Sequence, residues 1–567
     1  METVFKEIDL FLETEKDIPG DILSEILKGD TGMSSAGYPY ISNSSFNLFK
    51  SNVPHLFSDG QKILELIDQI EEKLGNKPSA VWGNYKTSAR VIRNIIYTAG
   101  ITAPPDLWLI RQLWQTHREI GTAEFISSGN LFSIEDLTAN FELNKKQITA
   151  DIRLLNARGY LDTEGDKFKA SAHIGALKQL APLDKNWKKD ITGELIKWLN
   201  NPTENPILEA IYNQELSDAK TNCWIASTKD IELAYLVLPL VLALRATKKS
   251  VGAVKGHTLK CTLSTSMNAV LSEAGMLEEG KVTELGARML SRGPGPYGII
   301  GTYHAYMAKG TELLKKGGSA VWVERGANVF ASQLANSKSF AQANNQLDRY
   351  CRNHNWKFEL FIEHAVGQGE ATRQRLERSG EARIQYFGAD LEDAAIDRAV
   401  EQQSLGLLPF NMKFIRAADI GAPEIVTDYL HNLGLDGQPT VMVVGNGFHE
   451  IRNQTNEKMI EVFRGYSKAG FVLIFTEETA LEDDDLRNTA WNTYHAGFRY
   501  VHEISGQGLR PTISSSKSTR LGWRECAELG GYTVLDEYTY RSRTIYPHPI
   551  EGKGNPSISV TYFCVPE

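Results

Sequence analysis

Cysteine is scarce in this chain, and positive charge is in the minority. Only five of the 567 residues are cysteines, and none stands in a CxxC pair. A zinc site or a disulfide framework built on cysteine is therefore not expected, and free thiols suit a reducing compartment. The 61 Lys and Arg residues are outnumbered by 70 Asp and Glu residues. This balance argues against nucleic acid as the main partner, because such a protein must neutralise phosphates.

Long hydrophobic runs are missing as well. The most apolar stretch extends from Leu233 to Leu244 and is interrupted by Pro239. At ~12 residues it is shorter than the roughly 20 that a bilayer requires, so it predicts a buried helix rather than a membrane span. The first residues are acidic and amphipathic and are not expected to form a secretory signal. A cytoplasmic protein without a membrane partner is expected.

Length and composition predict several domains. The chain is 42% hydrophobic, and at ~150 residues per domain it corresponds to about three or four units. We predict a helical region over 1–125, a winged-helix-like and helical region over 126–258, a second winged-helix-like or linker region over 259–355, and an α/β domain over 356–567. Within the first region, Pro104-Pro105 predicts a break before a further helix.

The second region has the order of elements found in a winged helix. Ser133 and Asn144 are placed to cap two short helices, and residues 161–168 are expected to form a two-stranded wing. A weaker copy is expected between Leu259 and Leu290. The second helix carries four basic residues but also Asp151, which favours a packing or dimerisation role over DNA reading; the basic residues are Lys145, Lys146, Arg153 and Arg158.

From Phe358 onward, short apolar segments alternate with helical ones. The segments 358–362, 382–388, 412–417, 440–444 and 471–475 are apolar throughout, which predicts parallel strands covered by helices on both faces. The fold class is therefore α/β, a Rossmann-like doubly wound sheet, preceded by a mainly α N-terminal half. Ligands are expected at the carboxyl ends of the strands.

Four motifs follow these strands. The first strand leads into a glycine-containing loop, Glu363-x-Ala365-x-Gly367-x-Gly369, and the second ends at Asp390. Asp419 follows the third strand, and Asn446-Gly447-Phe448-His449 follows the fourth. In this order the motifs resemble those of class I S-adenosylmethionine-dependent methyltransferases, with Ala365 in place of the first glycine. The C-terminal strands expected at 532–538 and 558–564 look like the antiparallel hairpin that closes that fold, and the upstream modules are similar to those of winged-helix O-methyltransferases.

The resemblance implies S-adenosylmethionine as cofactor and a set of residues that bind it. A carboxylate after the second strand would hold the ribose, and the residues after the third strand would approach the adenine. The implied set is Glu363, Ala365, Gly367, Gly369, Asp390, Leu391, Asp419, Ile420, Asn446 and Gly447.

The resemblance also implies a catalytic base. In related O-methyltransferases the histidine after strand four removes a proton from the acceptor, and His449 holds the matching position. Glu477 or Glu478, at the end of the next strand, is placed to orient it. His495 or His502 can replace His449 in this role. Residues 488–511 are rich in aromatic and amide groups. They are predicted to line the acceptor pocket with Trp491, Tyr494, His502 and Arg510. No metal site is expected.

The sequence leaves three candidate functions. A small-molecule methyltransferase, acting on oxygen or carbon and forming a homodimer through its helical half, is favoured. A winged-helix regulator whose cofactor domain only senses the cofactor, or is inactive, is the alternative. A nicotinamide-dependent dehydrogenase is disfavoured, because the motif at Asn446 and the closing hairpin have no role there.

Overall fold

The computed structural model divides the chain into two compact units. It describes residues 20–34, 37–53, 55–56, 59–74, 83–219, 221, 223–318, 325–379, 384–489, 491, 493–512, 519–551 and 554–567. Unit 1 comprises residues 1–321, 482–501 and 544–556, and unit 2 comprises residues 322–481, 502–543 and 557–567. The predicted four-part division stays a prediction, and the expectation about a secretory signal falls on residues outside the described ranges. Within those ranges, no helix combines the length and the apolar character that crossing a bilayer requires.

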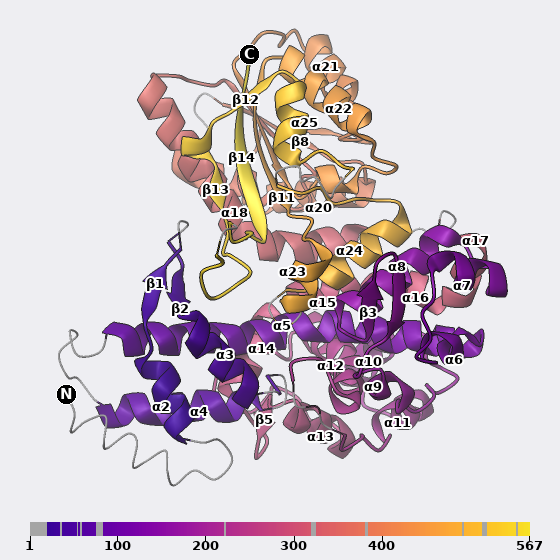
Figure 1. The fold of residues 1–567 in the computed structure, drawn as a ribbon. Coiled ribbons are helices and arrows are strands. Elements are labelled where there is room, and N and C mark those ends of the chain that lie inside the picture. Colours follow the sequence, from indigo (N-terminus) through magenta and orange to yellow (C-terminus); the bar gives the residue numbers. More distant parts are fainter. Residues whose placement is uncertain are drawn as a thin grey trace. The chain divides into compact units, whose positions relative to one another are not determined.

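Unit 1 is built mainly of helices (Figure 1). The helix Thr228–Ala246 (α12) contains the most apolar stretch of the sequence and is buried along most of its length, as predicted, with Pro239 inside it. The other elements of the unit are α2 (Gly20–Lys28), β1 (Thr31–Met33), β2 (Pro39–Ile41), α3 (Asn43–Asn52), α4 (Gly60–Leu74), α5 (Gly83–Glu119), α6 (Thr122–Ile126), α7 (Ile134–Phe141), α8 (Lys145–Ala157), β3 (Leu161–Glu164), β4 (Lys167–Ala170), α9 (Gly175–Lys178), α10 (Ile191–Asn200), α11 (Pro206–Tyr212), α13 (Thr265–Glu273), β5 (Leu277–Glu278), β6 (Lys281–Val282), α14 (Glu284–Arg292), α15 (Pro294–Gly301), α16 (His304–Ala308), α17 (Gly310–Lys316) and α23 (Asp483–Asn488).

Helix α5 continues through Pro104 and Pro105, so the predicted break there is wrong. A proline inside a helix removes a hydrogen bond and crowds the preceding turn, which costs ~3 kcal/mol. Every residue from Thr102 to His117 is buried, however. Burial of a large apolar side chain contributes about 1.5–3 kcal/mol, and this segment buries several, so packing outweighs the local preference of the backbone.

The two helices and the hairpin predicted over residues 133–168 are present in order, and their assignment as a winged helix stays a prediction. Ser133 caps α7 in a reciprocal pair with Asp136, and the side chain of Asn144 caps α8. Strands β3 and β4 then pair in antiparallel fashion as the expected hairpin. The weaker copy has a different order, in which one helix, α13, precedes the hairpin β5–β6 and another, α14, follows it.

Unit 2 is organised around one mixed sheet with the order β12-β14-β11-β10-β7-β8-β9. The five strands from β11 to β9 are parallel, whereas β14 is antiparallel to β11, β12 and the short β13. The predicted parallel sheet with an antiparallel closure is therefore confirmed. The strands are β7 (Leu360–His364), β8 (Gln385–Ala389), β9 (Lys413–Ile415), β10 (Thr440–Gly445), β11 (Phe471–Glu478), β12 (Tyr532–Val534), β13 (Tyr540–Arg541) and β14 (Ser559–Pro566).

Helices cover both faces of this sheet, which explains why its strands are apolar throughout. On β11, Leu473 packs into one core and Ile474 into the other, because successive side chains of a strand point to opposite faces. The first core includes residues of α21 (Pro423–Asn432), α22 (Asn456–Lys468) and α25 (Trp523–Leu529). The second includes residues of α18 (Arg325–His354), α19 (Glu370–Ser379) and α20 (Asp393–Ser404).

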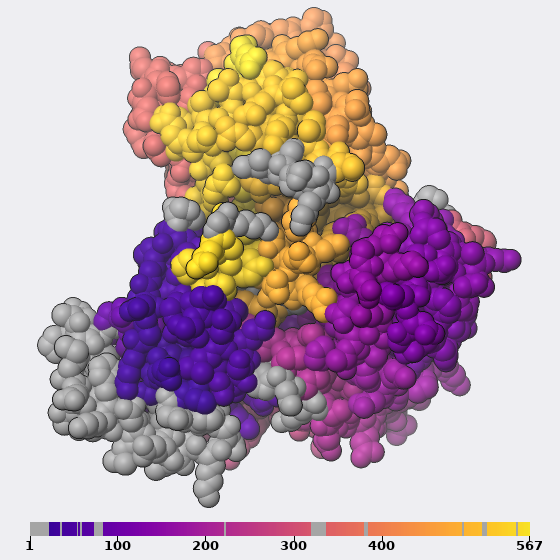
Figure 2. Space-filling model, viewed as in Figure 1, coloured from indigo at the N-terminus to yellow at the C-terminus, as the bar shows by residue number. Residues whose placement is uncertain are grey.

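Segments distant in sequence meet on the surface of unit 2. In Figure 2 the yellow residues near the C-terminus lie beside orange residues from the middle of the unit. The register of the sheet accounts for this, since Phe475 of β11 pairs with Tyr562 of β14. The neighbours of β7 are β8 on one side and β10 on the other. The order of the sheet therefore reverses at β7, and a ligand site is expected beside the carboxyl ends of β7 and β10.

Candidate functional site

The loop after β7 has an unusual backbone. Ala365, Gly367 and Gly369 have φ values of 57°, 50° and 77°. This left-handed region suits glycine and costs other residues roughly 1–2 kcal/mol. Ala365 therefore occupies a conformation that favours the glycine found at this position in the family that the motif resembles.

The side chain of Glu363 is buried beneath this loop and is not exposed on its surface. The side chain is 1% exposed, and its carboxylate accepts hydrogen bonds from the backbone N–H groups of Ala371 and Thr372 at 3.1 and 2.7 Å. These groups belong to the first turn of α19, so Glu363 attaches that helix to the end of the strand. Burial raises the pKa of Glu363 to about 7, against the lowering effect of these hydrogen bonds.

Asp390 links the loop to the next strand. Its carboxylate accepts hydrogen bonds from the N–H of Gly367 at 3.3 Å and from the N–H of Glu392 at 3.0 Å. Its backbone carbonyl accepts the N–H of Ala418, which joins the loop after β9 to the same place. Leu391, beside it, is 40% exposed.

Three of the predicted cofactor residues meet in one place. A methyl group added at Gly447 would lie 3.2 Å from Cδ1 of Ile420 and 3.5 Å from Cβ of Ala365. The loops after β7, β9 and β10 therefore converge where the strand order reverses. Asp419 is exposed, and its carboxylate accepts the N–H of Gly421 at 2.7 Å.

Asn446 opens the loop that follows β10. Its φ is 53°, and its backbone N–H donates to the carbonyl of Thr476 at 2.8 Å. Its amide donates to Oδ1 of Asn336 at 3.3 Å. These contacts fix the backbone that leads to His449.

His449 is buried, and it forms a dyad with Glu477. Nδ1 of His449 lies 2.7 Å from Oε2 of Glu477, and the other oxygen of that carboxylate accepts the N–H of Phe448 at 2.6 Å. Glu478 is the neighbour of Glu477 on β11 and therefore points to the opposite face. Of the two carboxylates suggested by the sequence, the structure brings Glu477 to the histidine.

Burial and charge act on the dyad in opposite directions. Burial favours the neutral imidazole of His449, but Glu477 and Glu450 outweigh it and raise the pKa of His449 to about 10. Burial likewise raises the pKa of Glu477, while the charge of His449 lowers it. The pair therefore favours an imidazolium beside a carboxylate.

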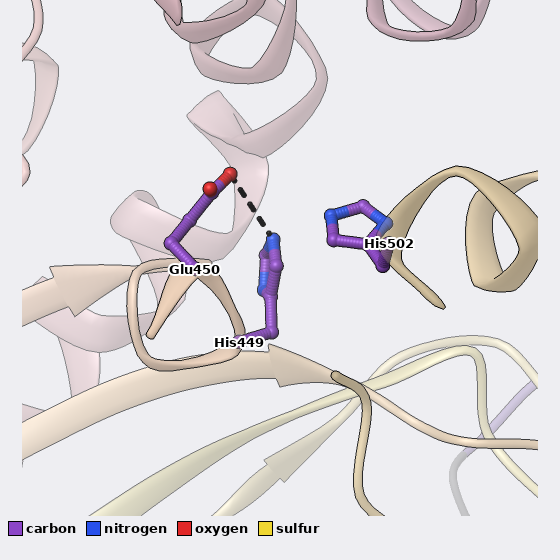
Figure 3. A group of neighbouring side chains, drawn as sticks. All are labelled: His449, Glu450 and His502. Atoms are coloured by element: carbon purple, nitrogen blue, oxygen red, sulfur yellow. Dashed lines mark ion pairs between the residues drawn. The ribbon is translucent and has the colours of Figure 1, made fainter. Parts of the chain in front are cut away.

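Glu450 and His502 complete a cluster around Nε2 of His449 (Figure 3). Oε1 of Glu450 lies 3.6 Å from this nitrogen, and the rings of His449 and His502 have centroids 4.8 Å apart at 77°. Glu450 was missed in the sequence, although it follows His449 directly. Carboxylates are common in turns, so only its orientation marks it.

Arg510 is fully buried, and other residues of unit 2 occupy its guanidinium. Nε donates to Oε1 of Gln454, Nη1 to Oδ1 of Asn456 and to the carbonyl of Leu521, and Nη2 to the carbonyl of Thr455. This placement favours a structural role over the predicted pairing with a substrate anion.

The remaining predicted residues belong to unit 1. Trp491 packs against Trp224 at 4.8 Å between ring centroids, and both line a cavity of about 30 Å³, which has room for about two water molecules. Tyr494 contacts His495, with ring centroids 5.9 Å apart, and His495 is buried. His495 starts α24 (His495–Ser505), whose last residues belong to unit 2. The roles predicted for these three residues stay predictions.

The sheet of unit 2, with β14 antiparallel between β11 and β12, has the antiparallel closure expected from the sequence. No protein-family model matches the sequence, and the search of curated proteins finds no match. Among solved structures the chain is similar to the CurJ carbon methyltransferase, with a TM-score of 0.38, 10% identity, and 85% of this chain and 97% of that chain covered.

Two further solved structures are similar at the same level. The methyltransferase domain of the citrinin polyketide synthase has a TM-score of 0.34 and 13% identity, with 90% of this chain and 97% of that chain covered. An O-methyltransferase family 2 protein from Planctomyces limnophilus, in complex with apigenin, has a TM-score of 0.32 and 9% identity, with 82% and 96% covered. Likeness at this level establishes no activity for this chain, whose function is inferred from its own side chains.

Proposed function

We propose that this protein transfers a methyl group from S-adenosylmethionine to an oxygen or an acidic carbon of a small molecule, with His449 as base and Glu477 as the group that orients it. The observation that carries the proposal is the convergence of Ala365, Ile420 and Gly447 beside Asp390, at the reversal of strand order. A nucleotide cofactor binds at such a position in doubly wound sheets.

The residues at this position fit the cofactor. The glycine-rich loop allows close approach of its backbone, and the carboxylate of Asp390 suits the ribose hydroxyls. Ile420 offers an apolar contact for the adenine, and Gly447 lets the backbone of the neighbouring loop come close to it. When bound, S-adenosylmethionine supplies an activated methyl group, and the protein supplies alignment and a base.

The dyad supports the proposal that the acceptor atom is an oxygen or an acidic carbon. With Nδ1 held by Glu477, Nε2 is the nitrogen that receives the proton of an acceptor hydroxyl or acidic carbon. Because the pKa of His449 is about 10, the imidazole keeps its proton at neutral pH in the protein without ligands. The dyad acts as a base only after Nε2 has released its proton to water, and Nε2 then takes up the proton that the acceptor hydroxyl or carbon loses.

Calorimetry with S-adenosylhomocysteine tests the cofactor, with NADH as the control nucleotide. We expect low-micromolar binding of the first and none of the second. Asp390→Ala is expected to weaken binding by roughly 10–100-fold, as for the loss of a charge-assisted hydrogen bond. Asp397, which pairs with Arg416 on the surface of the same unit, provides the matched control, and Asp397→Ala should bind as the wild type does. Binding of neither nucleotide would overturn the proposal.

Single-turnover methyl transfer tests the base. His449→Ala is expected to lower the rate by ~10²–10⁴ while the affinity for S-adenosylhomocysteine stays unchanged. A near-normal rate would exclude His449 from this role, and His502 or His495 would then be examined by the same measurement.

For the helical half we propose packing and homodimer formation in place of nucleic-acid reading. Three basic side chains in or directly after α8 form ion pairs with other residues of unit 1: Lys145 with Glu135, Arg153 with Asp483, and Arg158 with Asp106. Pairing of this kind supports the proposal because each carboxylate offsets a positive charge that phosphate binding would use. Light scattering tests the oligomeric state, and a monomer at micromolar concentration would contradict a dimer.

A further inference from the structure

Three potential metal ligands meet beside the dyad. One ligand atom each from His449, Glu450 and His502 lies within 4.8 Å of the other two, and Nε2 of His449 is 3.6 Å from Oε1 of Glu450. One ring nitrogen of His502 lies on the side of its ring that faces the other two residues (Figure 3). Two ligands of a tetrahedral zinc ion are about 3.4 Å apart, since each lies ~2.0–2.1 Å from the metal. The separation between His449 and Glu450 is already close to this value, and the ligand atom of His502 lies no more than 4.8 Å from either of theirs.

The surroundings of the cluster hold its ligands in place. Glu477 contacts Nδ1 of His449 at 2.7 Å, which leaves Nε2 directed at the cluster. Metal-bound histidines almost always have such an outer partner, and a carboxylate is one of the usual choices. The amide of Gln507 donates to Oε2 of Glu450, so this carboxylate is oriented too.

The backbone fixes the two halves of the cluster relative to each other. The N–H of Gly508 donates to the carbonyl of His449 at 3.2 Å, and the N–H of Asn453 donates to the carbonyl of Gly506 at 2.9 Å. The N–H of Gln507 donates to the carbonyl of His502. These bonds join the turn that carries His449 and Glu450 to the end of α24, where His502 stands.

We propose that His449, Glu450 and His502 form a binding site for one divalent transition-metal ion, with zinc as the expected occupant. Two imidazoles and one carboxylate are a known set of protein ligands for zinc and leave a coordination position open to water or another oxygen ligand. The negative charges of Glu450 and Glu477 together balance the charge of a divalent ion, which favours its burial here.

Metal binding and the base function exclude each other on the same nitrogen. The lone pair of Nε2 in His449 holds either a proton or a metal, so a chain with bound metal uses this histidine as a ligand. The site is inferred from ligand geometry and does not depend on the proposed methyl transfer.

Zinc content after desalting tests the site. The full chain is stripped with a chelator, incubated with Zn²⁺, passed through a desalting column and analysed by atomic emission. We expect about one tightly bound zinc ion per wild-type chain. Glu450→Gln and His502→Ala each remove a ligand and should lower retention to background. Glu477→Gln keeps all three ligands and should weaken affinity by roughly 10–100-fold, as for other outer partners of metal ligands.

Two controls separate this site from surface binding and from misfolding. His431 is 73% exposed and pairs with Asp436 at 2.6 Å, so it represents an ordinary surface histidine, and His431→Ala should retain zinc as the wild type does. Unfolding midpoints without metal establish that each variant is folded, and added zinc should raise the midpoint of the wild type but not of Glu450→Gln. If the wild type loses its zinc on desalting, or if both ligand variants retain as much as the wild type, the site does not exist.

Discussion

The carboxylate of Glu477 lies 2.7 Å from Nδ1 of His449, and the same carboxylate accepts the N–H of Phe448. One side chain at the end of β11 therefore orients both the imidazole and the turn that carries it. The functional consequence is that Nε2 of His449 points to the cluster with Glu450 and His502, where it can receive a proton or a metal ion.

Glu477→Gln should separate orientation from folding. An amide cannot stabilise the imidazolium as a carboxylate does, so we expect the rate of methyl transfer to fall by roughly 10²–10⁴ while the KM for the acceptor stays unchanged. Glu478→Gln alters the adjacent residue on the other face of the strand and should change the rate far less. Equal losses in both variants would point to a general effect on β11, and no loss in either would remove Glu477 from the dyad.

Ala365→Gly should stabilise the protein. The left-handed backbone at φ 57° costs alanine more than glycine loses through its greater freedom in the unfolded chain, and we expect a gain of about 0.5–1 kcal/mol in the free energy of unfolding. Ala417 has φ 51° outside the glycine loop, so Ala417→Gly is the matched control and should show a similar gain. Urea unfolding measures both, and a loss of stability in either variant would contradict the conformational argument.

Glu363→Gln should change how stability depends on pH. Burial raises the pKa of Glu363 from 4.5 to about 7 in the folded protein. Below 4.5 the group is protonated in both states. As the pH rises toward 7, the unfolded chain releases this proton before the folded protein does, and the folded state loses stability. The shift corresponds to roughly 3 kcal/mol.

The measurement is the free energy of unfolding of both proteins at about pH 5 and about pH 8. The glutamine variant cannot ionise, so its stability relative to the wild type should increase by roughly 3 kcal/mol between these values. A difference that does not depend on pH would show that Glu363 titrates normally.

Arg510→Lys should distinguish a structural arginine from one that binds substrate. A lysine has one nitrogen and cannot satisfy the acceptors on Gln454, Asn456 and the two backbone carbonyls at once. We expect a loss of about 3 kcal/mol in unfolding free energy, measured in urea. Unchanged stability together with a raised KM for an acidic acceptor would restore the anion-binding role.

Much of unit 2 could be predicted because its local patterns agree with its tertiary structure. The apolar strands, the glycines after β7 and the acid after β8 each reflect a requirement of the doubly wound sheet. The structure of unit 1 was harder to predict, because burial of side chains there overrides the local conformational preference of the backbone. The sequence around Pro104 and Pro105 indicates the end of a helix, yet packing of the following apolar residues keeps α5 intact.

Some features of the candidate site could likewise be predicted from local sequence, and others could not. Local sequence was sufficient to predict which strands are followed by the motif-bearing loops, because each motif lies directly after its strand along the chain; the choice of His449 over His495 and His502 stays a prediction. The sequence did not distinguish Glu477 from Glu478 as the partner of His449, since the two residues differ only in the face of β11 to which they point. It also left Arg510 as a candidate for substrate and gave no reason to combine Glu450 with His502. Those distinctions arise from the side-chain directions in the sheet and from the hydrogen bonds that join the turn after β10 to the end of α24, which depend on contacts between residues far apart in the chain.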